Sequence, residues 1–286
     1  MITLKLKKTR QVPNRWHELN EEQFVRLAGA IADFEAGITN FEQFKVMTVA
    51  AILDLKIDRL KMTDTLFENL FRISEQLDFP YRLHEKEDHK EVEFKICINR
   101  QMQPKVNQNK GYVFTVESGM IETSIVSEQY VDAISVMKLY SSDHSEQTLD
   151  MLVKVLYCPL PYSKENIQKV KPHKFSREQK LAVYYNFRGL LEWIRRIDKY
   201  DLIFNSAEEK PGKSPLGMEG SLYSLSKAGY GVYADICKMD LFTYLDLLLS
   251  QTIESIHSLK SCGLKPTEIA EKLNLTVGQI SSFIES

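Results

Sequence analysis

The 286-residue chain lacks the cysteine patterns of zinc-binding and disulfide-bonded proteins. No CxxC pair is present, and no histidine lies at zinc-ligand spacing beside any of the four cysteines. We therefore expect four free thiols in a reducing compartment and no resident metal or other cofactor. The cysteines are Cys97, Cys158, Cys237 and Cys262.

Long hydrophobic runs are also missing. The most apolar helix candidate, residues 241–256, is interrupted by Asp246 and Gln251, and this is typical of a core helix rather than of a membrane span. The N-terminal segment is charged from Lys5 onward, before an apolar stretch develops, so a signal peptide is not indicated either. The sequence therefore predicts no contact with a membrane.

Charge of one sign is not in excess. The chain has 37 basic and 39 acidic residues, for a net charge of -2. Proteins that hold nucleic acid mainly through its phosphates carry a broad positive field, and this composition does not provide one. Any contact with DNA would have to be local.

Motifs for catalysis are absent as well. There is no GxSxG elbow, and the glycines near 217–220 and 229–231 lack the flanking strand and helix start of a phosphate-binding loop. His84 and His89 lie in a run of charged residues, for which a surface metal site and a solvated acidic loop are the two interpretations, and the loop is favoured. We predict no catalytic, cofactor-binding or metal-binding residues, and so no enzyme.

What is present is mainly helical periodicity. Apolar residues recur at spacings of three and four, with capping boxes that start two of the helices at Asn20 with Gln23 and at Ser176 with Gln179. Helices are predicted over residues 20–35, 41–55, 65–77, 127–140, 148–157, 176–197 and 241–256.

Three short segments alternate instead with a period of two. They are residues 2–6, 92–98 and 112–116. Pro104 and the segment 107–111 supply turn residues, so the second and third are expected to pair through a long exposed loop, with residues 2–6 as a third strand.

Together these patterns predict a predominantly α-helical α+β fold. We expect helical bundles, a small antiparallel β element and a C-terminal hairpin like a helix-turn-helix. The predicted regions are a strand with a helical bundle, a β-hairpin insertion, a second helical region, a loop or linker and a C-terminal helical region, over residues 1–80, 81–120, 121–206, 207–220 and 221–286.

Aromatic and basic residues are interleaved in the helix predicted over 176–197. A stacking surface for single-stranded nucleic acid is one interpretation. Tyr184, Phe187 and Leu191 share one helical face, however, and this favours a buried stripe. A basic ridge is then predicted on the other face, formed by Arg188, Arg195 and Arg196.

The C-terminal segment 263–284 resembles a helix-turn-helix. Ile269, Ala270 and Leu273 fall on the first helix, and Val277 and Ile280 on the second. The second helix carries no lysine or arginine, so a hairpin that packs or grips a partner is favoured over a reader of DNA. Candidate contact residues for a partner or for DNA are Thr276, Gly278, Gln279, Ser281 and Ser282.

Residues 19–55 and 125–157 show an internal similarity. Leu19 to Val25 resembles Ile125 to Val131, and further on Met47 aligns with Met151. A duplicated helical hairpin is one interpretation. The other is that any helix which starts with an acidic residue and a glutamine before an apolar face looks alike.

Two segments resemble proteins of phage and prophage tail modules of Bacteroides-type bacteria. One runs from Val12 to Phe24, and the other from Leu222 through the Gly-Tyr-Gly sequence to Leu245. The resemblance implies a phage assembly or virion structural protein, such as a tail assembly chaperone or a connector, that works in the bacterial host cytoplasm or the virion. It carries no catalytic residues.

The expected partners are other phage structural or assembly proteins, and the chain itself as a homo-oligomer. The exposed, turn-rich segments 102–110 and 210–220 are the predicted contact regions. The alternative is a DNA-binding regulator or a DNA-packaging accessory that uses the C-terminal segment.

Overall fold

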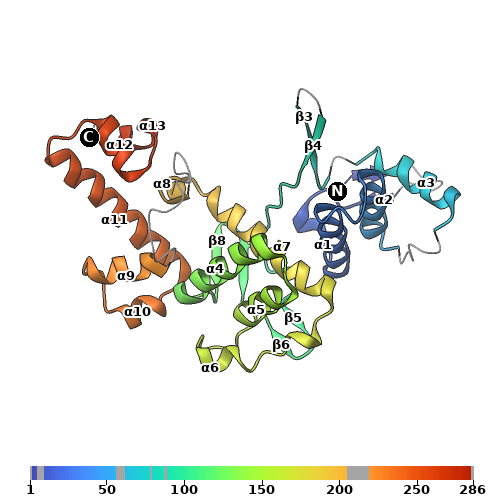
Figure 1. Ribbon diagram of the computed structural model, residues 1–286, viewed down its shortest axis with the longest axis horizontal. Coiled ribbons are helices and arrows are strands. Elements are labelled where there is room, and N and C mark those ends of the chain that lie inside the picture. The colour runs from blue at the N-terminus through green and yellow to red at the C-terminus, as the bar shows by residue number, and fades with distance from the viewer. Residues whose placement is uncertain are drawn as a thin grey trace.

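The computed structural model describes residues 2–4, 10–55, 62–77, 79–86, 89–204 and 219–284. The molecule is elongated, with α1 to α3 at one end, the C-terminal helices at the other and the long helix α7 between them (Figure 1). The predicted segment 207–220 lies outside the described residues except for its last two positions.

The N-terminal end is a group of helices beside a short β-ribbon. The side chains of Asn20 and Gln23 form the predicted capping box at the start of α1, and Asn40 with Gln43 forms another at the start of α2. Trp16 is buried against Phe24 and Phe79. The elements are β1 (Ile2–Leu4), β2 (Arg10–Val12), η1 (Trp16–Glu18), α1 (Glu21–Glu35), α2 (Phe41–Ile52) and α3 (Asp64–Ser74).

The strands form separate two-stranded antiparallel ribbons, each closed by neighbouring segments of the chain. The predicted pairing of residues 92–98 with 112–116 is wrong, because β4 pairs with β3 and β7 pairs with β8. Residues 2–4 pair with 10–12 rather than joining a larger sheet. The ribbon strands are β3 (Arg82–Lys86), β4 (His89–Glu93), β5 (Lys105–Val106), β6 (Asn109–Lys110), β7 (Phe114–Glu117) and β8 (Met120–Thr123).

The alternation of apolar and other residues over 94–98 has a different cause. This segment crosses α7 instead of pairing with a strand. The amide of Ile98 donates to the carbonyl of Gly189 at 3.0 Å, in the middle of that helix. A Cβ atom at Gly189 would lie 2.9 Å from side-chain atoms of both Ile96 and Ile98. The missing side chain therefore permits the close approach, and the apolar alternation follows from packing on a helix.

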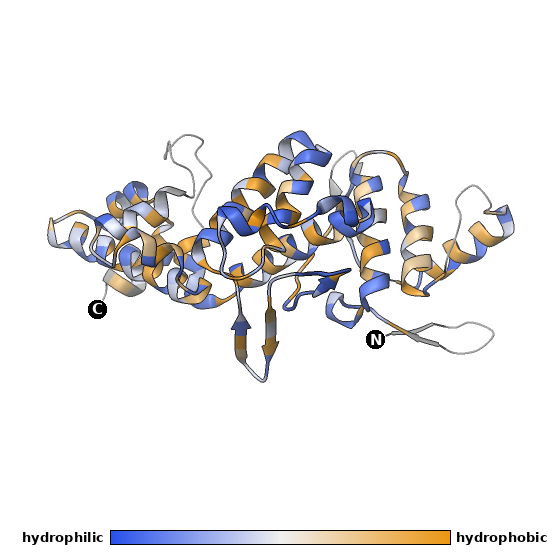
Figure 2. Ribbon diagram, turned by 90° about the horizontal axis from the view of Figure 1, so that it is seen from below, coloured by the Kyte–Doolittle hydropathy of each residue, from blue (hydrophilic) through white to orange (hydrophobic). Residues whose placement is uncertain are grey.

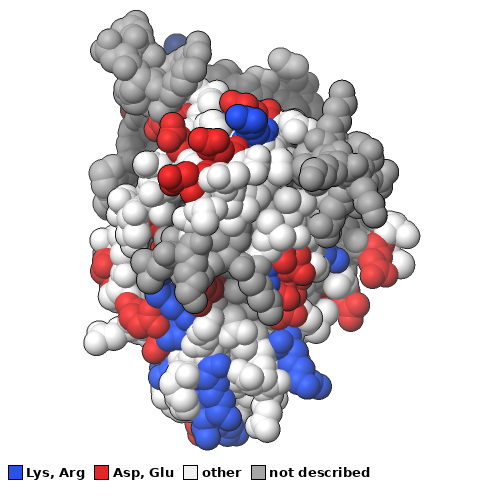
Figure 3. Space-filling view, turned by 90° about the vertical axis from the view of Figure 1, so that its right-hand side faces the viewer, with Lys and Arg blue, Asp and Glu red and all other residues white. Residues whose placement is uncertain are grey.

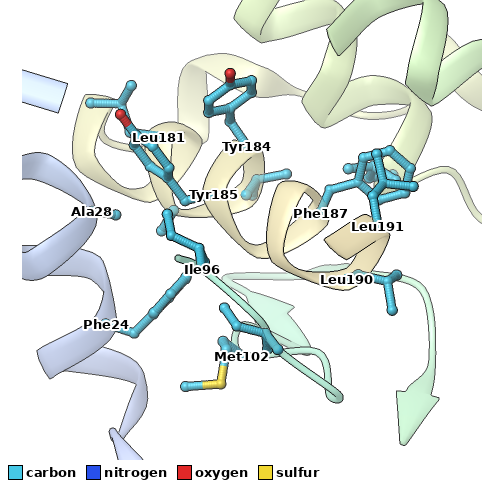
Figure 4. Close-up of a cluster of buried hydrophobic side chains, with 14 of the residues drawn as sticks. Phe24, Ala28, Ile96, Met102, Leu181, Tyr184, Tyr185, Phe187, Leu190 and Leu191 are labelled. Carbon is cyan, nitrogen blue, oxygen red and sulfur yellow. The ribbon is translucent and has the colours of Figure 1, made fainter. Parts of the chain in front are cut away.

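Helix α7 is the centre of the fold. It contacts α1 on one side and α5 on the other, and its buried face joins both groups to the segment 94–102 (Figure 4). Tyr184, Phe187 and Leu191 are buried there, as the stripe interpretation predicted. The central elements are α4 (Ser127–Asp143), α5 (Glu146–Leu156), α6 (Lys164–Ile167), η3 (Pro172–Lys174), α7 (Arg177–Arg195), η4 (Asp198–Tyr200) and α8 (Asp201–Phe204).

The C-terminal part has two cores. The first half of α11 belongs to the main core, which extends from Val12 to Leu245 and so runs across the ranges predicted as separate regions. The second half of α11 forms a smaller cluster with α12, α13 and Leu202 of α8. The helices are α9 (Glu219–Lys227), α10 (Tyr233–Cys237), α11 (Leu241–Ser261), α12 (Pro266–Leu273) and α13 (Val277–Ile284).

The predicted fold class, a predominantly helical α+β fold, is confirmed. The four cysteines are free thiols, with Cys158 and Cys237 buried. No helix within the described ranges has the length and apolar character needed to cross a membrane.

Candidate functional site

The predicted basic ridge lies along one wall of a hollow of about 660 Å³. Arg188, Arg195 and Arg196 all line it, from the second half of α7 and its C-cap. Arg188 pairs with Glu35 of α1 at 3.2 Å, and Arg196 donates to Glu192 from Nε and Nη2 at 2.9 and 2.8 Å. Arg195 is exposed and has no ion-pair partner among the residues described. The ridge is therefore largely neutralised by neighbouring acids.

The opposite wall is formed by the β3–β4 ribbon and residues 94–96. His84 Nε2 lies 2.5 Å from a carboxylate oxygen of Glu93, and Lys95 lies 3.4 Å from the same oxygen. The hydrogen bond to His84 and the charge of Lys95 lower the pKa of Glu93. His84 was placed in a solvated loop by the sequence, and it lies instead on strand β3.

This hollow is not arranged for acid–base catalysis. The side chains of His84 and Glu93 are 49% and 43% exposed, so water screens the pair and burial does not tune it. Within the described residues, no group of three or more histidine, cysteine, aspartate or glutamate side chains is placed to hold a metal ion. The side chain of His89 lies outside the described atoms.

The C-terminal hairpin has the predicted arrangement of helix, turn and helix. Asn274 adopts a left-handed conformation that ends α12, and Leu275 in the turn is buried. Thr276 accepts a hydrogen bond from the amide of Gln279 at 3.3 Å and so caps α13. Ile269 and Ile280 are fully buried between the helices. The two helices thus hold each other in a fixed orientation.

The predicted contact residues of this hairpin have different surroundings. Thr276 and Gly278 are exposed, whereas Ser281 is half-buried and its hydroxyl donates to Val277 O at 2.8 Å. The side-chain amide of Gln279 donates to the carboxylate and the carbonyl of Asp201 in α8, at 2.9 and 3.2 Å. Gln279 thus fastens α13 to the rest of the protein. The side chain of Ser282 lies outside the described atoms.

The surface of the hairpin has no net positive charge. Lys265 and Lys272 of this segment are exposed, and so are Glu268 and Glu271. Helix α13 contains no lysine or arginine. A helix that enters a groove of DNA needs donors for phosphate and for base edges, and here these are limited to small polar groups.

One exposed feature was not predicted from the sequence. The β7–β8 ribbon projects from the body (Figure 2), and the apolar Met120 and Ile121 are exposed directly after its polar turn. Its tight turn consists of Ser118 and Gly119, both with positive φ. The Ser-Gly pair between two alternating segments was a signal for this hairpin, but the first strand had been assigned to a different partner.

The second predicted contact region, residues 102–110, is folded rather than loose. Met102, Gln103 and Val106 are buried, whereas Pro104, the β5–β6 turn and the flanking lysines are exposed. No protein-family model, curated protein or solved structure matches this chain. Proposals about function therefore depend on the geometry of these surfaces.

Proposed function

We propose that this chain is a non-enzymatic assembly protein that joins protein partners in a phage tail or head-tail module. The resemblance of residues 12–24 and 222–245 to tail-module proteins supplies the biological setting. The observation that carries the proposal is the projecting β7–β8 ribbon. Its partners would be other structural or assembly proteins of the particle, in the host cytoplasm or the virion.

The ribbon is anchored at its base and unsupported at its tip. Phe114, at the base, is fully buried and packs edge-on against Trp193 of α7 at a centroid distance of 5.6 Å. Met120, at the tip, is 74% exposed and is the most exposed large apolar side chain that the structure describes. Ile121 beside it is 38% exposed.

The exposed Met120 and Ile121 offer apolar surface that a partner can cover. A two-stranded ribbon is only marginally stable alone, and an exposed apolar tip adds an aggregation hazard. A methionine side chain adapts to irregular apolar pockets, as partner-binding surfaces often require. We infer that a protein partner encloses this end of the ribbon, with Met120 covered on one face and Ile121 on the other, and with the open strand edges beside them available for main-chain hydrogen bonds.

Co-expression with candidate tail and portal proteins, followed by affinity capture of the full chain, tests the proposal. Met120→Asp with Ile121→Asp is expected to reduce capture of the partner at least about tenfold, the effect of losing a buried apolar anchor. The matched control is Met151→Asp, because Met151 is a methionine of α5 that is 47% exposed. If the tip variant captures the tail and portal proteins as well as the native chain does, the tip has no role in binding them.

A second candidate function rests on the C-terminal hairpin. Its fixed α12–α13 geometry, with Thr276 and Gly278 exposed at the start of the second helix, favours a DNA-binding regulator or a packaging accessory as the alternative. The substitutions Lys265→Glu and Lys272→Glu remove the two exposed lysines of this segment without altering its core. If this hairpin holds DNA, they must weaken the binding of duplex DNA strongly.

A further inference from the structure

Positive charge is concentrated on one part of the central unit. Residues 164–177 contain four lysines and an arginine against the single acid Glu165, and residues 100–111 contain Arg100, Lys105 and Lys110 without an acid. In Figure 3, lysine and arginine side chains gather at the lower end of the view, at the height where Figure 1 shows α6 and the β5–β6 ribbon. The near-neutral total charge thus conceals a local cationic surface.

The two basic segments meet in the folded chain. The side-chain amide of Asn107, in the β5–β6 turn, donates to the carbonyl of Lys174 at 2.7 Å. The amide of Lys174 in turn donates to the carbonyl of Lys171 at 3.1 Å. Four exposed lysines are thereby grouped on the β5–β6 ribbon and the η3 turn, and we call them the lysine surface: Lys105, Lys110, Lys171 and Lys174.

In the described part of the chain, acids do not neutralise these lysines, whereas several other cations of the central unit are paired with carboxylates. Lys180 pairs with Glu146 and Asp150, Arg188 with Glu35, and Arg196 with Glu192. Over the ranges that the structure describes, none of the four lysines of the surface has an ion-pair partner. Lys105 and Lys110 are also register partners across the ribbon, an arrangement in which like charges repel. The surface keeps its charge at some cost to local stability.

The backbone that carries the lysines is held firmly. Val106 is buried, and the amide of Gly111 donates to the carbonyl of Pro104 at 3.0 Å. Tyr157 donates its hydroxyl to the carbonyl of Gln103 at 2.6 Å, and its ring packs edge-on against Phe175. A fixed backbone presents the charges in a constant pattern.

We propose that the lysine surface binds the phosphate backbone of duplex nucleic acid, independently of base sequence. Beside the lysines, Asn107, Gln108 and His173 are exposed and polar, and the apolar Pro104 is exposed too, whereas Val106, Pro172 and Phe175 are buried. A protein interface needs an apolar centre, and one exposed proline at the edge of this surface does not provide it. Phosphate groups need only cations and amide donors, and the surface supplies both.

The aromatic residues near the surface argue against single strands. Single-stranded nucleic acid is held by exposed rings on which bases stack. The rings of Tyr157 and Phe175 beside the lysines are buried against each other, and the exposed imidazole of His173 alone does not form a platform for successive bases. A duplex, whose bases are already stacked and whose phosphates face outward, is the form of nucleic acid that fits.

The test is a titration of the full-length protein into a labelled duplex of random sequence, about two helical turns long, followed by fluorescence anisotropy. Four phosphate contacts predict a slope of about -3.6 for the logarithm of the affinity against that of the salt concentration, or about 150-fold weaker binding at 200 mM than at 50 mM salt. The double variant Lys105→Ala with Lys110→Ala should reduce the magnitude of this slope by about 1.8.

Two further variants separate this surface from the other candidate. Charge reversal of all four lysines to glutamate should abolish binding at 50 mM salt while thermal unfolding stays cooperative. Lys265→Glu with Lys272→Glu, on the C-terminal hairpin, should leave the affinity within about twofold. The inference is overturned if the hairpin variant loses binding and the four-lysine variant keeps it, or if no duplex binding occurs at low salt. Lysine-dependent binding of polyglutamate without binding of the duplex would also overturn it, because the partner would then be an acidic polypeptide.

Discussion

Gln23 and Gln129 make the same hydrogen bond in two separate helical hairpins. Gln23 Nε2, near the start of α1, donates to the carbonyl of Ile52 at the end of α2, at 2.7 Å. Gln129 Nε2, near the start of α4, donates to the carbonyl of Val155 near the end of α5, at 2.9 Å. Both side chains are buried. The two glutamines are aligned in the internal similarity, whereas the acceptor Val155 lies one position before Leu156, which aligns with Ile52. The corresponding donors favour the interpretation that residues 19–55 and 125–157 are copies of one hairpin, with a shift of one residue at the acceptor.

The two glutamines differ in one respect that predicts a difference in stability. Gln23 also accepts a hydrogen bond from the amide of Asn20 in the capping box, whereas the side-chain oxygen of Gln129 has no hydrogen-bond partner in the structure. We expect Gln129→Ala to lower the free energy of unfolding by about 2 kcal/mol, because a buried carbonyl loses its donor. Gln23→Ala should cost about 1 kcal/mol more, since the bond from the Asn20 amide to the Gln23 side chain, half of the capping box, is lost as well. Urea unfolding of the three proteins measures the difference, and an equal cost for the two variants would contradict it.

A second prediction concerns the substitution of Gly189 by alanine. Its effect on the free energy of unfolding should be opposite in sign to the effect that helix propensity alone predicts. Alanine is better than glycine by about 1 kcal/mol inside an exposed helix. A Cβ atom here, however, would lie 2.9 Å from atoms of Ile96 and Ile98, which are themselves buried. We expect Gly189→Ala to lower the free energy of unfolding by about 1–3 kcal/mol, the usual cost of overpacking.

A matched control for this prediction is the combination of Gly189→Ala with Ile98→Val, which frees space beside the new methyl group. The combination should be more stable than the sum of the two single effects implies. If Gly189→Ala alone stabilises the chain to chemical denaturation, the close contact between residues 96–98 and α7 is not the reason for this glycine.

The helices were predictable from the sequence because the signals that start them are local. Asn20 with Gln23, and Ser176 with Gln179, form within four residues the capping boxes that the structure contains. The pairing of the strands was not predictable in the same way. Phe94, Ile96 and Ile98 alternate like a strand, but α7 is the surface that buries them, and no residue near them in sequence identifies that partner.

The same limit applies to the candidate sites. Arg188, Arg195 and Arg196 could be grouped from the sequence because they lie on one helix and its C-cap, and they line the same hollow. The acids that neutralise them come in part from α1, and Glu35 is more than 150 residues away in sequence, as its bond to Arg188 shows. The lysine surface was missed for this reason too, since Asn107 and Lys174 are joined only by folding.

The hydrogen bonds of Asp143 predict how the stability of the chain depends on pH in the acidic range. Its carboxylate accepts hydrogen bonds from the amide of Ser145 at 2.9 Å and from the hydroxyl of Thr148 at 2.6 Å, at the start of α5. The bond from the Ser145 amide, followed by that from Thr148, lowers the pKa of Asp143 below its ordinary value of 3.8. A lowered carboxyl pKa gives stability that is present above the unfolded value and is lost as the pH falls through the folded value.

We therefore expect the native chain to lose stability as the pH falls below about 4, and Asp143→Asn to lose less over the same interval. Unfolding by urea at a series of pH values between about 2 and 6 measures the two curves. The variant should be the less stable protein at neutral pH, and the curves should approach each other in acid. Parallel curves would show that this carboxylate is not bound more tightly in the folded chain.

Single substitutions of Lys105 and Lys110 by glutamate should change the stability and the affinity for duplex DNA in opposite directions. The two lysines face each other across the β5–β6 ribbon, and like charges in this position are unfavourable. Lys105→Glu replaces the repulsion with an attraction, so the free energy of unfolding should rise by up to about 1 kcal/mol. The same change removes positive charge from the lysine surface, so the affinity for duplex DNA should fall.

A double-mutant cycle gives the control for this prediction. Lys110→Glu alone should stabilise the chain as much as Lys105→Glu does, whereas the two together restore a like-charge pair and should remove the gain. Affinity for the duplex should fall in every one of these variants, and most in the double variant, because it depends on the total positive charge and not on the pairing. If the affinity followed the stability instead, rising in the single variants, the lysines would act on binding through the fold and not through contact with phosphate.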